Sequence, residues 1–208
     1  MIASKTAPYI RHPSDGTAIS DYLIYEILDG LPIFYNGYKD VLLNKKRADE
    51  IKYKSSLTSF ILSNLFCQFL KLLDDDKYVV FSNLGFYINE SNNLTGGIVI
   101  YEESEFRKMI INEHYADVPA KIAIEVDVTA DTSDIGGVDT YVYKKVRKLL
   151  NFGVERVIWI NTATKTILIA DDNLKSWIVQ DWNKDIEIIE GLTINVPAFL
   201  LKKKIVVK

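Results

Sequence analysis

The sequence predicts a single α/β domain in which a mixed central sheet carries helices on its faces. Runs rich in β-branched and aromatic residues alternate with amphipathic segments along the chain. Within residues 121–161, a buried strand, a helix and a second strand follow one another, which favours two strands joined by a helical crossover. A chain of 208 residues is long enough for one well-buried domain and too short for two comfortable ones.

Composition and charge are those of a soluble globular protein, with 48% hydrophobic and 25% charged residues. No apolar run approaches the roughly 18 residues that a membrane span needs. Residues 1–16 resemble a loose arm and lack the apolar core of a secretory signal, so we expect a cytoplasmic protein without membrane contact. The net charge of −3 argues against broad electrostatic capture of DNA or RNA, although basic residues cluster at 44–54, 143–148 and 201–208.

The first half of the chain predicts a helix between two groups of strands. Residues 19–36 form either a short helix or a strand pair, with a turn at Asp29-Gly30. Apolar residues at helical spacing over 46–73 predict one helix, which ends at an acidic cluster. Three strands follow, punctuated by Asn92-Asn93 and Gly96-Gly97: 78–83, 85–89 and 96–101.

The second half predicts the strand–helix–strand unit and the remaining strands. A short helix over 102–113 precedes the nearly continuous apolar run 121–128, which is typical of a central strand. Residues 138–152 predict an amphipathic helix, with Gly153 as its C-terminal stop. Further strands are expected at 156–161, 166–171 and 176–182, followed by a strand and a short helix within 192–204.

Glu125 is the residue with the clearest chemical argument. It follows three apolar residues in the predicted central strand, and a carboxylate there needs a partner. Asp127 lies two residues on and is expected on the same face, where two like charges repel unless a cation lies between them. A hard divalent cation would serve. So would the basic residues of the following helix, and an exposed strand end with ordinary salt bridges explains the same pattern.

Several short elements are similar, in the same order, to those of one known family: YEILDG (25–30), GGIVIYEE (96–103), VPAKIAIEV (118–126), YKKVRKLLNFGVERVIWIN (143–161) and EGLTINVPAFL (190–200). Lys145 also lies eight residues before Gly153, which is the family's spacing. On these elements, the chain resembles the Uma-two family of restriction-endonuclease-like proteins, within the PD-(D/E)XK nuclease superfamily. The resemblance covers roughly residues 20–201.

The resemblance implies a restriction-endonuclease-type fold and metal-dependent hydrolysis of DNA phosphodiester bonds. It implies that Glu125 and the Val126 carbonyl bind Mg²⁺ or Mn²⁺, and that Lys145 assists the attacking water. Such a metal polarises the phosphoryl oxygen and lowers the pKa of its bound water. A lysine adds positive charge near the reacting centre.

The chain departs from the family pattern at one of the two carboxylates that bind the metal. Gly97 stands where the family has its first aspartate, and Tyr141 stands where the family has another, four residues before the lysine. Asp127, which is expected to share a face with Glu125, and Glu26 are the candidate replacements as metal ligands. The alternative is a catalytically degenerate relative that acts as a binding or interaction module. We expect a homodimer.

Other chemistries find little support in the sequence. The acidic segment 127–134 fails as a calcium loop, because its sixth position is Thr132 rather than glycine. His12 and His114 lie far apart and do not suggest a zinc site. Cys67 lies in an apolar helical run, so we expect it to be buried. We expect the three tryptophans to pack in the sheet rather than to stack on bases.

Overall fold

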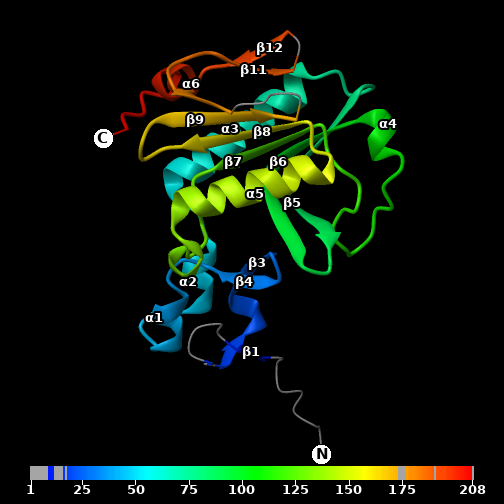
Figure 1. Cartoon of the computed structure of the whole chain (residues 1–208). Coiled ribbons are helices and arrows are strands. Elements are labelled where there is room, and N and C mark those ends of the chain that lie inside the picture. The colour runs from blue at the N-terminus through cyan, green and yellow to red at the C-terminus, as the bar shows by residue number, and fades with distance from the viewer. Residues whose placement is uncertain (1–8, 12–15, 17, 173–176, 190, 208) are drawn as a thin grey trace, which may run out of the picture.

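A large mixed sheet with a long helix on each face forms the body of the protein (Figure 1). The structure is a computed structural model that describes residues 9–11, 16, 18–172, 177–189 and 191–207. Within that part of the chain, the sheet has eight strands: β3 (Ile24–Leu28), β4 (Leu31–Phe34), β5 (Tyr78–Asn89), β6 (Asn92–Glu102), β7 (Ile122–Val126), β8 (Arg156–Asn161), β9 (Thr166–Asp171) and β10 (Ile178–Asp181). Their order is β10-β9-β8-β7-β6-β3-β4, and β5 also pairs with β6.

The helices and two small sheets surround this body. The helices are α1 (Tyr38–Leu42), α2 (Ala48–Lys52), α3 (Ser56–Leu72), α4 (Glu103–Phe106), α5 (Val138–Phe152) and α6 (Val196–Lys202). Short 3₁₀ turns lie at Asp21–Leu23 and Ser133–Ile135. The small antiparallel sheets pair β1 (Tyr9–Arg11) with β2 (Ala18–Ser20), and β11 (Ile186–Ile189) with β12 (Leu192–Ile194). No helix in the described part of the chain is both long and apolar enough to cross a membrane.

The strand–helix–strand unit has the predicted arrangement. β7 pairs with β8 in parallel and with β6 in antiparallel orientation, so the sheet is mixed. The connecting helix α5 ends at Gly153, whose φ of +113° places it in the left-handed region that glycine tolerates best. All five residues of β7 are buried, as expected of a central strand with both faces covered.

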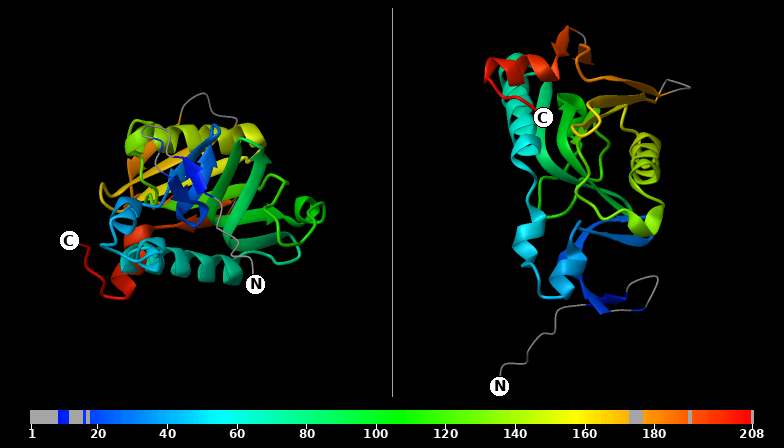
Figure 2. Two further views of the ribbon diagram at one scale, coloured as in Figure 1. Left: turned by 90° about the horizontal axis from the view of Figure 1, so that it is seen from below. Right: turned by 90° about the vertical axis from the view of Figure 1, so that its left-hand side faces the viewer.

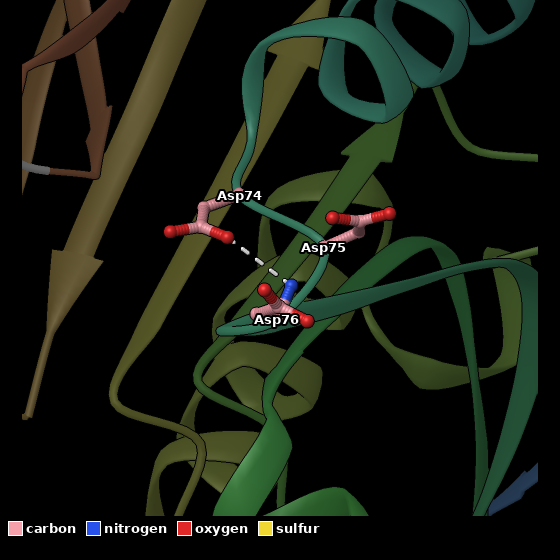
Figure 3. A group of neighbouring side chains, drawn as sticks. All are labelled: Asp74, Asp75 and Asp76. Atoms are coloured by element: carbon pink, nitrogen blue, oxygen red, sulfur yellow. Dashed lines mark hydrogen bonds between the residues drawn. The ribbon is translucent and has the colours of Figure 1, made fainter.

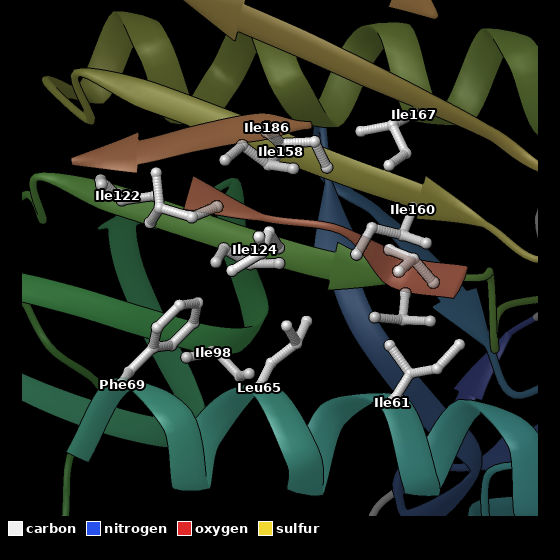
Figure 4. Close-up of a cluster of buried hydrophobic side chains, with 14 of the residues drawn as sticks. Ile61, Leu65, Phe69, Ile98, Ile122, Ile124, Ile158, Ile160, Ile167 and Ile186 are labelled. Atoms are coloured by element: carbon white, nitrogen blue, oxygen red, sulfur yellow. The ribbon is translucent and has the colours of Figure 1, made fainter. Parts of the chain in front are cut away.

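Two hydrophobic cores lie on opposite faces of the sheet. Figure 2 shows α3 and α5 on the two sides, and Figure 4 shows the core beneath α3. There, Ile61, Leu65 and Phe69 of the helix meet a layer of isoleucines from β6, β7 and β8: Ile98, Ile122, Ile124, Ile158 and Ile160. The core beneath α5 contains Val146 and Leu149 of that helix, packed against alternate residues of the same strands.

The N-terminal hairpin of β3 and β4 turns where the sequence predicts. Asp29 and Gly30 both have positive φ, +55° and +76°, as a two-residue hairpin turn requires. The turn is tied to α5, because Asp29 forms salt bridges with Lys144 and Lys148. Of the expected arm, Tyr9–Arg11 forms a strand, whereas residues 1–8 and 12–15 lie outside the described residues.

Several local expectations were wrong. The helix expected over 46–73 is two helices, because residues 53–55 are non-helical and Ser55 caps α3 by accepting a hydrogen bond from the Thr58 amide. Strand β5 runs unbroken through 78–89. Cys67 is exposed, because α3 buries Ile61, Leu65 and Phe69, and Cys67 projects away from that stripe.

Candidate functional site

Three charged side chains from three elements meet inside the domain. Strand β7 carries Glu125, helix α5 carries Lys145 and strand β3 carries Glu26. Their exposed fractions are 2%, 0% and 3%. Charged residues are almost never this buried unless they are paired. The sequence named all three, and the structure brings them together.

The ammonium group of Lys145 lies between the two carboxylates. Its Nζ is 2.9 Å from Glu26 Oε2 and 2.9 Å from Glu125 Oε1. It also donates a hydrogen bond to the Thr95 hydroxyl at 3.0 Å. An ammonium has three donors, and its three hydrogen bonds go to Glu26, to Thr95 and, at 3.4 Å, to the Tyr141 hydroxyl. The contact with Glu125 is a salt bridge alone, and the buried Glu125 Oε1 has no hydrogen-bond partner among the described residues. The two carboxylate oxygens are therefore at most 5.8 Å apart, with a cation already between them.

Both oxygens of Glu26 are engaged by donors other than a metal. Oε2 accepts from the Thr95 amide at 3.1 Å as well as from Lys145. Oε1 accepts from the hydroxyl of Tyr141, which lies one helical turn before Lys145 on the same face of α5. Glu26 is thus held in a closed network of hydrogen bonds.

The charge state of the cluster follows from these contacts. Burial acts to lower the pKa of Lys145, but Glu125 and Glu26 raise it more, so the pKa lies well above its usual value. Burial raises the pKa of the Tyr141 hydroxyl, with Glu26 adding to the shift. Lys145 is therefore a fixed cation rather than a proton acceptor. Three aromatic ring centroids lie 5.5 to 5.8 Å from its Nζ: those of Tyr25, Tyr141 and Trp159.

A cavity of about 600 Å³, here called the Glu125 cavity, opens on the other side of Glu125. Gly96 and Gly97 of β6 form part of its wall. A Cβ placed on Gly97 would lie 3.3 Å from Glu125 Oε2 and only 2.9 Å from the Ile124 carbonyl oxygen. The position at which the family has an aspartate therefore faces Glu125, but the backbones of β6 and β7 have closed on the space that its side chain would need.

Gly96 and Gly97 lie in the interior of β6. At this pair, the side chains of β6 stop alternating regularly between the two faces of the sheet. Leu94 packs in the core beneath α5, whereas Ile98, an even number of residues on, packs beneath α3. Regular alternation would place both on one face. The irregularity lies beside Asn83 of β5, whose φ is +53°. Because Gly96 and Gly97 have no side chains, a cavity lined by α3 extends as far as Glu125 Oε2. The other oxygen of Glu125, Oε1, contacts Lys145 on the α5 side of the sheet.

Asp127 lies in a different cavity from Glu125. Strand β7 ends at Val126, and Asp127 has a φ of +56°, so the alternation that predicted a shared face does not extend to it. Its carboxylate accepts hydrogen bonds from the Thr58 hydroxyl at 2.6 Å, and from the Thr162 amide and hydroxyl at 2.8 and 3.0 Å. It thereby joins the first turn of α3 to the loop after β8, and it lines a cavity of about 370 Å³, here called the Asp127 cavity.

The contacts of these residues decide whether they can together bind a divalent metal ion. Glu125 offers Oε2 toward its cavity, Gly97 offers no ligand, and Glu26 and Asp127 are committed to other donors. Val126 is buried and paired in register with Ile160 of β8. The described residues therefore do not complete the two-carboxylate site that the resemblance implies. Mg²⁺ is usually bound by one or two carboxylates together with substrate phosphates.

Another acidic group lies elsewhere, in the turn between α3 and β5. Asp74, Asp75 and Asp76 each place a carboxylate oxygen within 4.8 Å of the others, and all three are exposed (Figure 3). The Asp74 side chain accepts a hydrogen bond from the Asp76 amide and forms a salt bridge with Lys77. These contacts are those of a solvated turn.

Comparison with solved structures identifies several similar chains. One of them is described as "a putative nuclease belonging to DUF820", from Anabaena variabilis, and it matches with a TM-score of 0.58 at 14% sequence identity, over 83% of this chain and 87% of that chain. The likeness shows that the two chains share a fold. The predicted fold class, a mixed sheet flanked by helices, is confirmed. No family model and no curated protein matches the sequence.

Sequence reasoning missed two members of the buried network, Thr95 and Tyr141, as functional candidates. Tyr141 was noted only as a departure from the family pattern. Its position four residues before Lys145 is a signal that could have placed it on the buried face of α5. Thr95 had no such signal, because its contact with Glu26 spans 69 residues and depends on the pairing of β3 with β6.

Proposed function

We propose that this chain is a nuclease-fold protein that binds nucleic acid at the Glu125 cavity and has lost the second carboxylate needed for efficient metal-dependent cleavage. Gly97 carries the proposal, since it faces Glu125 where a carboxylate is expected. DNA is the expected partner, from the sequence resemblance and from the nuclease-like fold. The predicted homodimer and cytoplasmic location stay predictions, which analytical ultracentrifugation and cell fractionation can test.

Electrostatics support binding without a metal. The buried cluster has two carboxylates and one ammonium, so Lys145 offsets half of its negative charge. The exposed Lys52 and the half-buried Lys54 line the same cavity and supply positive charge. Because both lysines are more exposed than the buried Glu125, a phosphate in the solvent-accessible part of the cavity can contact them without contacting Glu125. A bound phosphate can thus be held by lysines alone, which is the sequence-independent mode of nucleic-acid binding.

The second candidate function is a Mg²⁺- or Mn²⁺-dependent DNA endonuclease. It is favoured by Glu125 Oε2, which faces a cavity with room for an ion and a phosphate. The Val126 carbonyl, Asp127 and Glu26 are the other predicted ligands, and a bound metal would activate water and polarise the phosphoryl oxygen. Because its pKa is raised, Lys145 would act there as a fixed positive charge near the reacting phosphate.

Binding and nicking assays on the same protein preparations separate the two functions. Oligonucleotide binding is measured in EDTA, and plasmid nicking with Mg²⁺ or Mn²⁺, for the wild type, Glu125→Gln and the exposed control Glu113→Gln. The proposal expects binding in EDTA and no nicking that depends on Glu125. Nicking that Glu125→Gln abolishes and Glu113→Gln retains would support the endonuclease. Absence of binding under every condition would refute both functions.

A further inference from the structure

The non-helical segment between α2 and α3 forms a ridge between two cavities. Tyr53, Lys54 and Thr129 line both the Glu125 cavity and the Asp127 cavity. We call Tyr53 and Lys54 the ridge. Tyr53 is 79% exposed. Such an amphipathic ring offers a flat face to a ligand that passes from one cavity to the other.

The positive charge near the ridge is free to bind a ligand. Within the described part of the chain, neither Lys52 nor Lys54 forms a salt bridge. Lys54 Nζ donates to the Thr129 hydroxyl at 3.2 Å, and Lys52 Nζ lies 5.6 Å from the centroid of the Tyr35 ring. These neutral partners orient the ammonium groups but leave their charge uncompensated.

This combination of charge and aromatic surface suits a single strand better than a duplex. Duplex binding depends on many phosphate contacts, and this acidic chain supplies only two uncompensated lysines at the ridge. Single strands gain affinity from bases stacked on aromatic side chains, which needs no net charge. A cavity of about 600 Å³ also has the size of a small-ligand site.

We propose that a single strand of nucleic acid crosses the ridge, with one base stacked on Tyr53 and the flanking phosphates bound by Lys52 and Lys54. The strand then enters the Glu125 cavity on one side of the ridge and the Asp127 cavity on the other. This inference rests on the proposed function, because it names the form of nucleic acid that the same site binds.

Fluorescence anisotropy with labelled oligonucleotides of one length, single-stranded and duplex, in EDTA, tests the inference. Tyr53→Ala should weaken single-strand binding roughly 5- to 100-fold, whereas Tyr53→Phe should retain it, because the ring is what stacks. Lys54→Ala should lower the salt dependence of binding by about 0.7 in the log–log slope.

Two matched variants control for nonspecific effects. Tyr115→Ala removes another exposed tyrosine, which lines a separate cavity. Lys71→Ala removes an exposed lysine near the far end of α3, about 22 Å along the helix from Ser56, where α3 begins, at 1.5 Å per residue. Both should bind as the wild type does.

The outcomes distinguish failure of this inference from failure of the proposed function. Tighter binding to the duplex, or Tyr53→Ala affinity within twofold of wild type, would overturn the single-strand inference while leaving nucleic-acid binding in place. If the wild type binds neither oligonucleotide, the proposed function fails together with the inference.

Discussion

Replacing Lys145 by methionine keeps the length of the side chain and removes a fully buried cation. In the described part of the chain, Lys145 is the only cation that forms a salt bridge with Glu26 or Glu125. The variant would leave two buried carboxylates uncompensated, and breaking a buried ion pair in this way costs about 3–5 kcal/mol of unfolding free energy. That is a large fraction of the roughly 5–15 kcal/mol that holds a typical domain folded.

Lys148→Met is the matched control on the same helix. Its side chain is 33% exposed and pairs with Asp29, which is 36% exposed, so its loss should cost about 0–1 kcal/mol. Urea denaturation followed by circular dichroism gives the unfolding free energy of each variant. If Lys145→Met and Lys148→Met were equally stable, the buried cluster would not be the electrostatic centre that we describe.

The pH dependence of these differences provides a second measurement. In the wild type, the folded-state pKa of Lys145 is raised. Its stabilising contribution should therefore be fully present below the unfolded value of about 10.4 and should be lost as the pH rises through the folded value. A stability difference that does not change with pH would contradict this reasoning.

Three further predictions concern single positions. Gly97→Ala should destabilise the fold by about 1–3 kcal/mol, because its Cβ would lie 2.9 Å from the Ile124 carbonyl oxygen; an unchanged denaturation midpoint would refute this. Asp127→Ala should lose about 2–4 kcal/mol, and Asp127→Asn markedly less, because asparagine tolerates the left-handed backbone; this is checked by thermal unfolding. Cys67 should react with Ellman's reagent in the native protein, as one thiol per chain; a thiol that reacts only in denaturant would contradict its exposure.

The features that the sequence predicted best are those that depend on residues close together along the chain. The bounds of α5, its stop at Gly153 and the turn at Asp29-Gly30 all follow from local periodicity and turn chemistry. The break between α2 and α3 was missed, because the apolar spacing continues across residues 53–55 although the backbone does not. Local patterns therefore predicted where helices and strands lie better than they predicted where one element is interrupted.

The sequence identified residues of the candidate site, but it did not show how they are arranged in space. Glu125, Lys145 and Glu26 were named from the sequence, and their roles stay predictions. The contact between Glu26 and Lys145 joins residues 119 apart, so it depends on how β3 is placed against the sheet, which periodicity does not report. Asp127 shows the same limit, since alternation along β7 holds only as far as the strand continues.

The close approach of β6 and β7 at Gly97 has an energetic consequence. Introducing an aspartate there would push a Cβ into the Ile124 carbonyl oxygen, so the strands would first have to separate. A second carboxylate at position 97 would therefore come with a loss of stability, unless a compensating change moved β6 away from β7.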